Sequence, residues 1–159
     1  MKLAFIATKD NSIHFFKELA DSLSKNVSGL ELVERFVPSI DDVPVVALEE
    51  SEEAEFIFVF ALTENKEMVA IVKDKLIDVE LTSGTRILKI VEEDSYSGTP
   101  EEEYYGVKEE LVKKYSELII SILFNEVDFE PKQRDFSLWL LKRVLWKNKI
   151  EYTYIYLSL

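Results

Sequence analysis

One segment restricts the fold of this chain more than any other, because residues 56–62 are apolar without interruption. The run reads Phe-Ile-Phe-Val-Phe-Ala-Leu, and most of its residues are aromatic or β-branched. A strand with no polar side offers no face to water, so it must lie inside a sheet that is covered on both faces. The sequence therefore predicts a parallel sheet between two layers of helices.

Strand-like and helix-like patterns alternate around this run. Further strands are predicted at residues 2–8, 30–37 and 86–91. Helices are predicted at about residues 13–23, 45–51, 67–81 and 101–124, where apolar residues recur at helical spacing. Short loops between such elements favour right-handed crossovers between parallel strands. We therefore predict an α/β fold, a three-layer flavodoxin-like sandwich with a central, mainly parallel sheet.

The sequence changes character after Pro131. Residues 136–146 are apolar nearly all round if they are helical, and residues 150–159 alternate like a strand. We therefore divide the chain into an α/β domain over residues 1–130 and an apolar C-terminal extension, a helix plus a strand, over residues 131–159. Two interpretations of the extension stay open: it completes the same core, or it makes a contact between subunits.

Charge and composition exclude several classes of protein. The 159 residues hold 31 Asp and Glu against 19 Lys and Arg, a net charge of −12, which argues against nucleic-acid and anionic-membrane binding. The chain has no cysteine, so disulfides, thiolate metal sites and a cysteine nucleophile are excluded. No run is long enough to cross a bilayer and no signal pattern is present, so we expect a cytoplasmic protein. Four Gly, four Pro and a charged fraction of 31% are typical of thermophile proteins.

The candidate site is expected where the strands end. Ligands of doubly wound sheets bind beyond the carboxyl ends of the strands, at the point where the strand order reverses. The loops predicted there are residues 8–12, 38–44 and 63–67. From these loops we take seven candidate binding residues: Thr8, Asp10, Ile40, Asp41, Asp42, Thr63 and Glu64.

The second of these loops is the most informative. Pro38 and Pro44 fix the backbone on both sides of the acidic pair Asp41 and Asp42. An ionised carboxylate such as that of Asp42 accepts strong hydrogen bonds from sugar-like hydroxyls. The alternative is a rigid turn in which Asp42 caps the helix that starts near Pro44.

Other candidates are weaker. His14 is a candidate acid or base, or else a partly exposed residue of the first helical turn. The acidic runs 49–53 and 101–103 lack the spaced oxygens and sharp Gly turn of a calcium loop, so solvated helix starts are the simpler interpretation. No phosphate-binding loop, nucleophile elbow or zinc-helix motif occurs, and we assign no catalytic residue and no metal site.

The loop after the second strand resembles a known family. The run Val37-Pro38-x-x-x-Asp42-x-Pro44 is similar to the Val-Pro-Gly-x-x-acid-x-Pro signature of the lumazine synthase family, and most similar to its archaeal riboflavin synthase branch. A strand ending near Thr8, a strand ending in Leu62 and a Glu-Glu-Asp loop at 92–94 agree in order and spacing. The resemblance covers about residues 1–130.

The resemblance implies a function and a site. It implies a pentamer with active sites between subunits, in which residues 40–42 hold the ribityl chain of a lumazine ring system. The reaction of this branch is a dismutation, in which one 6,7-dimethyl-8-ribityllumazine gives a four-carbon unit to another and yields riboflavin and a pyrimidinedione. The resemblance implies no cofactor other than Mg²⁺, and its substrate carries no phosphate, in keeping with an acidic protein.

Several positions depart from the family pattern. Ser39 replaces the family glycine, Asp10 falls where relatives carry a stacking aromatic residue, and residues 63–67 contain no glycine. The histidine expected after the third strand is absent, because His14 is the only one. Three hypotheses follow: a riboflavin synthase-like transferase with impaired activity, a non-catalytic oligomeric paralogue, or a flavin- or lumazine-binding module.

Overall fold

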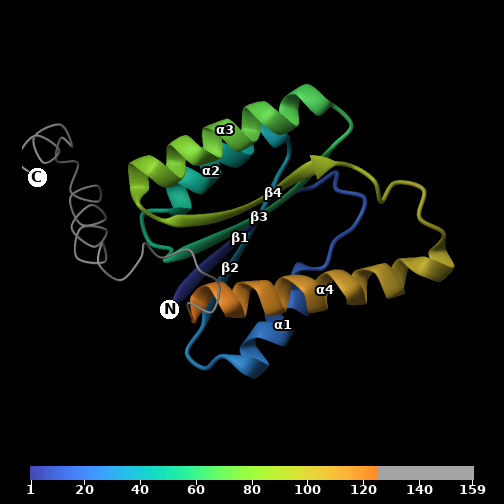
Figure 1. Cartoon of the computed structure of the whole chain (residues 1–159), viewed down its shortest axis with the longest axis horizontal. Helices are drawn as coiled ribbons and strands as arrows, with labels where there is room; N and C mark the ends of the chain where they lie inside the picture. Colours follow the sequence, from blue (N-terminus) through green and yellow to red (C-terminus); the bar gives the residue numbers. More distant parts are fainter. Residues whose placement is uncertain (125–159) are drawn as a thin grey trace, which may run out of the picture.

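The computed structural model describes residues 1–124, and these residues form a single parallel sheet between two layers of helices (Figure 1). The strands are β1 (Lys2–Thr8), β2 (Glu31–Val37), β3 (Phe56–Thr63) and β4 (Arg86–Glu93). The helices are α1 (Phe16–Asn26), α2 (Val43–Glu50), α3 (Lys66–Ser83) and α4 (Glu101–Leu123), with a short 3₁₀ turn η1 (Ile40–Asp42). The predicted extension over residues 131–159 lies outside the described residues.

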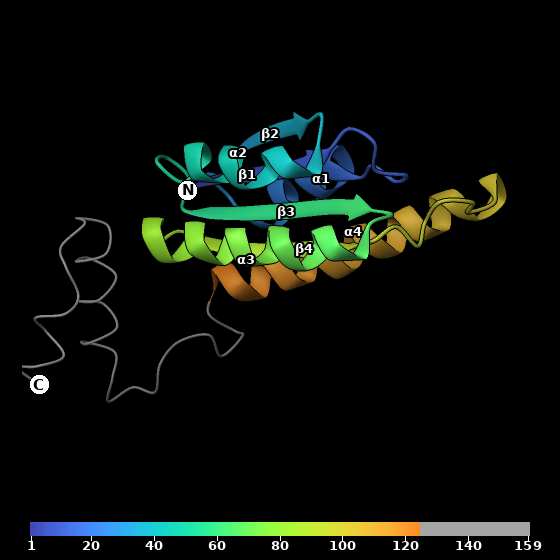
Figure 2. The same cartoon turned by 90° about the horizontal axis from the view of Figure 1, so that it is seen from above.

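The sheet is parallel throughout and has the order β2-β1-β3-β4. Helices α2 and α3 cover one face, while α1 and α4 cover the other (Figures 1 and 2). This arrangement confirms the predicted three-layer α/β sandwich. No helix within residues 1–124 is long and apolar enough to span a bilayer.

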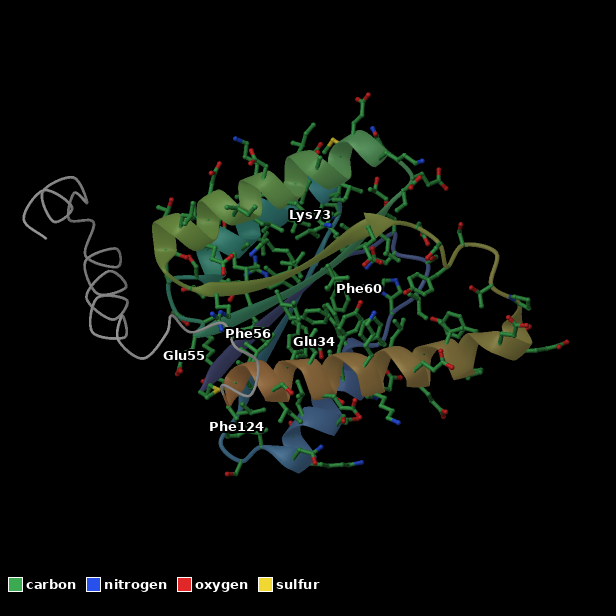
Figure 3. All side chains as sticks on the ribbon, in the orientation of Figure 1. Glu34, Glu55, Phe56, Phe60, Lys73 and Phe124 are labelled. Atoms are coloured by element: carbon green, nitrogen blue, oxygen red, sulfur yellow. The ribbon has the colours of Figure 1, made fainter. Side chains whose placement is uncertain are left out.

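The apolar run in β3 is explained by its two covered faces. Phe56, Phe58 and Phe60 alternate with Ile57, Val59 and Ala61, and all six side chains are buried. The phenylalanines join the core under α1 and α4, where Figure 3 shows Phe56 and Phe60, and the smaller residues join the core under α2 and α3. Each fully buried Phe or Ile stabilises the fold by about 1.5–3 kcal/mol, so both faces of β3 contribute.

The first helix differs from its prediction. It begins at Phe16 rather than near Ile13, and its N-cap residue, Phe15, makes no side-chain capping bond. The polar residues Asn11 and Ser12, which precede the helix, are hydrogen-bonded to β3 and to Asp94 and do not cap it. The chain therefore needs three more residues before it can turn into a helix.

The two edge strands carry charged side chains. Glu31 and Glu34 of β2 are exposed, and Glu34 is labelled in Figure 3. At the opposite edge, Lys89 of β4 forms an ion pair with Glu80 of α3, and Glu92 and Glu93 at the end of β4 are exposed.

Candidate functional site

The strand order reverses between β1 and β3, and the candidate loops start there. From β1 the chain crosses to β2 on one side, and it later returns to place β3 on the other side of β1. The loops after β1, β2 and β3 therefore leave from the same edge of the sheet. This is the position at which doubly wound folds bind their ligands.

A buried amide fills the gap between β1 and β3. The side chain of Asn11 is 5% exposed; its Nδ2 donates to the carbonyl of Phe60 over 2.9 Å, and its Oδ1 accepts from the amide of Leu62 over 2.9 Å. The hydroxyl of Thr8 donates to the same Oδ1. The hollow beside Asn11, between His14 and Phe60, has no room for a water molecule. A ligand at this edge must therefore lie above Asn11 and not between the strands.

The segment between the two prolines is held beside the first loop. The amide of Lys9 donates to the carbonyl of Val37 over 2.9 Å, which ties the end of β2 to the loop after β1. The amide of Asp42 donates to the carbonyl of Ser39 over 3.1 Å, and Ser39 Oγ accepts from the amide of Asp41 over 3.4 Å. Backbone bonds thus fix the acidic pair, and η1 contacts β3 and α3.

The acidic pair faces outward from this fixed backbone. Asp41 is exposed and Asp42 is half-buried, while Ile40 packs on the core under α2 and α3. Asp42 takes the N-cap position of α2, as the turn interpretation predicts, but its side chain makes no capping hydrogen bond. Neither carboxylate is in an ion pair with another residue of 1–124. Both are therefore free to accept hydrogen bonds from a ligand.

The other candidate residues have different surroundings. Thr8 is fully buried, so its side chain shapes the loop through Asn11. Asp10 and Glu64 are exposed carboxylates. Thr63 is half-buried, and its Oγ1 accepts from the amide of Asn65 over 3.1 Å. The accessible groups of this edge are therefore mainly carboxylates.

Asp94 organises the edge in a way that the sequence reasoning missed. Its Oδ1 accepts from Ser12 Oγ over 2.6 Å and from the amides of Tyr96 and Ser97 over 2.9 and 3.1 Å. Its own amide donates to the carbonyl of Thr63 over 2.9 Å. Asp94 thus joins the loops after β1, β3 and β4. The run Asp-Ser-Tyr-Ser-Gly at 94–98, an Asp that opens a turn with Ser and Gly, is the sequence signal that could have found it.

A buried tyrosine lies below this edge. Tyr115 of α4 is 1% exposed and packs between the rings of Phe15, Phe58 and Phe60. Burial raises its pKa well above the usual range, and the negative charge of Glu92 adds to the shift. Within residues 1–124 its hydroxyl has no hydrogen-bond partner, which makes it a costly buried group.

The edge is strongly acidic. The loops, the end of β4 and the start of α3 carry eight acidic residues there against Lys9 and Lys66: Asp10, Asp41, Asp42, Glu64, Glu67, Glu92, Glu93 and Asp94. Lys66 is already paired with Glu93 over 3.7 Å. This charge disfavours a phosphate-bearing ligand and favours a neutral or cationic ligand rich in hydrogen-bond donors.

The weaker candidates have structural roles. His14 is exposed before α1, with its ring 6.1 Å from that of Phe36 between centroids. In the run 49–53, Glu49 and Glu50 pair with Arg35, at 3.5 and 2.5 Å, and Glu53 pairs with Lys2. No three acidic or histidine side chains within residues 1–124 are placed to bind one metal ion. The described residues therefore offer no three-ligand site for the Mg²⁺ that the family resemblance implies.

A larger hollow lies away from the sheet edge. It has a volume of about 410 Å³ and lies between α1 and α4, where Tyr105, Lys108 and Ser22 are among its lining residues. The ion pair between Lys108 and Glu18, at 2.6 Å, lies beside it. We place the candidate site at the sheet edge because the strand reversal and the three loops meet there.

Fold and edge together define a doubly wound α/β protein with an acidic rim at its strand reversal. No protein-family model matches the chain, and a search of curated proteins found no match.

Proposed function

We propose that the carboxyl edge of the sheet binds a lumazine or a flavin through Asp41 and Asp42, in a homo-oligomer related to the archaeal riboflavin synthases. The observation that carries this proposal is the fixed backbone of residues 38–42, which presents two carboxylates that have no ion-pair partner within residues 1–124. A ribityl chain offers several hydroxyl donors to such a pair. The acidic rim agrees with a ligand that lacks phosphate.

If the protein is catalytic, its reaction is the dismutation of 6,7-dimethyl-8-ribityllumazine to riboflavin and a pyrimidinedione. Two features favour the second candidate, a paralogue or module that binds without turnover. Asp10 stands where relatives stack an aromatic ring, and Asn11 fills the gap between β1 and β3. Binding and turnover are therefore separate parts of the proposal.

The ligand part is tested by fluorescence titration of riboflavin and of 6,7-dimethyl-8-ribityllumazine. Loss of a hydrogen bond to a charged group weakens binding by about tenfold to a hundredfold, so Asp42→Asn is expected to raise the Kd by this factor. The matched control is Asp21→Asn, which neutralises an exposed carboxylate on α1 and is expected to leave the Kd unchanged.

Equal affinity of Asp42→Asn and the wild-type chain would place the ligand elsewhere, and no binding by the wild-type chain would remove the proposal. Turnover is followed separately by incubating the chain with the lumazine and recording the appearance of riboflavin absorbance. Riboflavin formation supports the synthase, and tight binding without it supports the non-catalytic candidate.

A further inference from the structure

The layer of α2 and α3 presents an unusual outer surface. Residues 1–124 expose nine large apolar side chains, and five of them lie on these two helices. We call these five residues the α2–α3 face: Val45, Leu48, Ile71, Ile77 and Leu81. Each is 44–58% exposed, although α2 and α3 already bury their other sides against the sheet and each other. An apolar surface of this kind normally marks a protein interface.

The charge of the same layer is negative. Helices α2 and α3 carry six acidic residues against three lysines. Asp74 is exposed on the outside of α3 and is three positions from both Ile71 and Ile77, so it adjoins the apolar side chains. Asp78 is exposed beside Ile77 and forms an exposed ion pair with Lys75 of the same helix over 3.7 Å. A partner of this face should therefore be apolar and basic.

The sequence after residue 124 contains a segment that is both apolar and basic. Residues 1–124 hold 26 acidic against 13 basic side chains, a balance of −13, whereas residues 132–149 hold six Lys and Arg against one Asp. Within that basic segment, eight of the eleven residues 136–146 are apolar, and they include Trp139 and Trp146. The chain thus carries an acidic apolar face and a basic apolar segment.

The composition of residues 136–146 points to a second copy as the source of the segment. Only three of residues 136–146 are polar, so this stretch has no polar side to turn toward water. The α2–α3 face of one copy would cover only one side of it. Contact with two surfaces, one in each of two copies, would cover it. An interface in which each copy gives its segment to one neighbour and receives a segment from another is heterologous, and such contacts form a ring when the rotation closes.

The chain leaves the fold at a place that allows this contact. Helix α4 ends at Leu123, and Figure 3 shows Phe124 at the same end of the molecule as Glu55, which precedes β3. The seven residues 125–131 can span up to about 23 Å when extended, which is about two packed layers. Residues 132–149 can therefore extend past the helix layer of their own copy and contact a second copy.

We propose that residues 132–149 of one copy bind the α2–α3 face of a second copy, with Asp74 and Asp78 facing the basic residues of the segment. The proposal rests on the homo-oligomer part of the proposed function and is independent of the ligand.

Both tryptophans of the chain, Trp139 and Trp146, lie in the segment, so tryptophan fluorescence reports whether the segment is bound. Trp139→Asp with Trp146→Asp gives a segment variant that has an intact face and no tryptophan. Leu48→Asp with Ile71→Asp gives a face variant that has an intact segment. Loss of even one buried Leu or Ile contact weakens an association about tenfold or more, so each variant alone is expected to sediment as a monomer.

Mixing the two variants is the decisive measurement. The segment of the face variant can bind the intact face of the segment variant, so the mixture is expected to form a dimer and to protect tryptophan from acrylamide quenching. Tyr105→Asp is the matched control: Tyr105 is an exposed apolar residue on α4, on the other side of the sheet, and its replacement is expected to leave wild-type assembly unchanged.

Charge exchange gives a second test that does not alter apolar packing. Asp74→Lys with Asp78→Lys, and Lys142→Glu with Arg143→Glu, are each expected to weaken assembly, and a mixture of the two variants is expected to restore it. Asp74 and Asp78 are exposed, and substitutions at exposed positions rarely affect folding.

Three results would overturn the proposal. A wild-type monomer with protected tryptophans would show that the segment binds its own chain. A wild-type monomer with exposed tryptophans would remove the homo-oligomer as well. A wild-type oligomer whose variants fail to complement each other in both tests would remove only the assignment of segment to face.

Discussion

Asn11 shows how one side chain closes the edge where ligands of this fold normally enter. Its amide satisfies a carbonyl and an amide of β3 and the hydroxyl of Thr8 from a buried position. Asp10, Asn11 and Ser12 are all residue types that favour helix caps. Local preference alone could not reveal that β3, some fifty residues away, supplies the partners.

We expect Asn11→Ala to lower the free energy of unfolding by about 2–3 kcal/mol, because several buried polar groups lose their partner. Chemical denaturation measures the change. Asn26→Ala, which removes an exposed hydrogen bond to the carbonyl of Ser22 over 2.7 Å, is the control and is expected to cost about 0.5 kcal/mol or less. A similar loss in both variants would mean that Asn11 has no special role.

Tyr115 presents the opposite case, a buried hydroxyl that residues 1–124 leave without a partner. We expect Tyr115→Phe to stabilise the protein by about 1 kcal/mol, because it removes an unsatisfied polar group and keeps the ring contacts. Tyr115→Ala is expected to cost about 3–5 kcal/mol, because it removes the ring itself. Destabilisation by Tyr115→Phe would show that the hydroxyl is bonded.

The same residue predicts a loss of stability at alkaline pH. Its pKa is raised on folding, so above the ordinary tyrosine value of 10.0 the unfolded chain binds fewer protons than the folded one, and stability falls as pH rises. Thermal unfolding between neutral and alkaline pH is expected to show a smaller loss for Tyr115→Phe than for the wild type.

At the scale of elements, the type and order of the predicted strands and helices are confirmed within residues 1–124, because each has an apolar pattern of its own, although α1 begins three residues later than predicted. Alternation along β3 even separates the two cores, with Phe58 on one side and Val59 on the other. The polar contacts between loops were not predictable in this way. Asp94 and Ser12 are more than eighty residues apart, and only the closing of the sheet brings them within 2.6 Å.

The ion pair between α1 and α4 gives a prediction for acid. Burial is the largest single effect and raises the pKa of Glu18. The hydrogen bond and charge of Lys108, a backbone hydrogen bond and the charge of Lys17 together outweigh it and leave the pKa lowered. A lowered folded-state pKa stabilises the protein above the ordinary value of 4.5, and this stabilisation is lost as pH falls through the lower folded value.

We therefore expect Lys108→Met to cost about 0.5 kcal/mol at pH 7, since Glu18 is largely exposed and solvent screens the pair, and to cost nothing near pH 2. Denaturation at both pH values measures the difference. Lys113→Met, at an exposed position on the same helix, should show no such pH dependence. A cost that persists in acid would assign the effect of Lys108 to the packing of its aliphatic stem.

At the scale of the whole molecule, both edge strands of the sheet carry charged side chains. Glu31 and Glu34 stand along β2, and Lys89, Glu92 and Glu93 stand along β4. Unpaired backbone groups at a sheet edge invite strands from other molecules, and ionised side chains make that pairing expensive. Concentrated solutions of this protein should consequently resist fibril growth, even though its central strand, cut out as a free peptide, has the composition of an amyloid former.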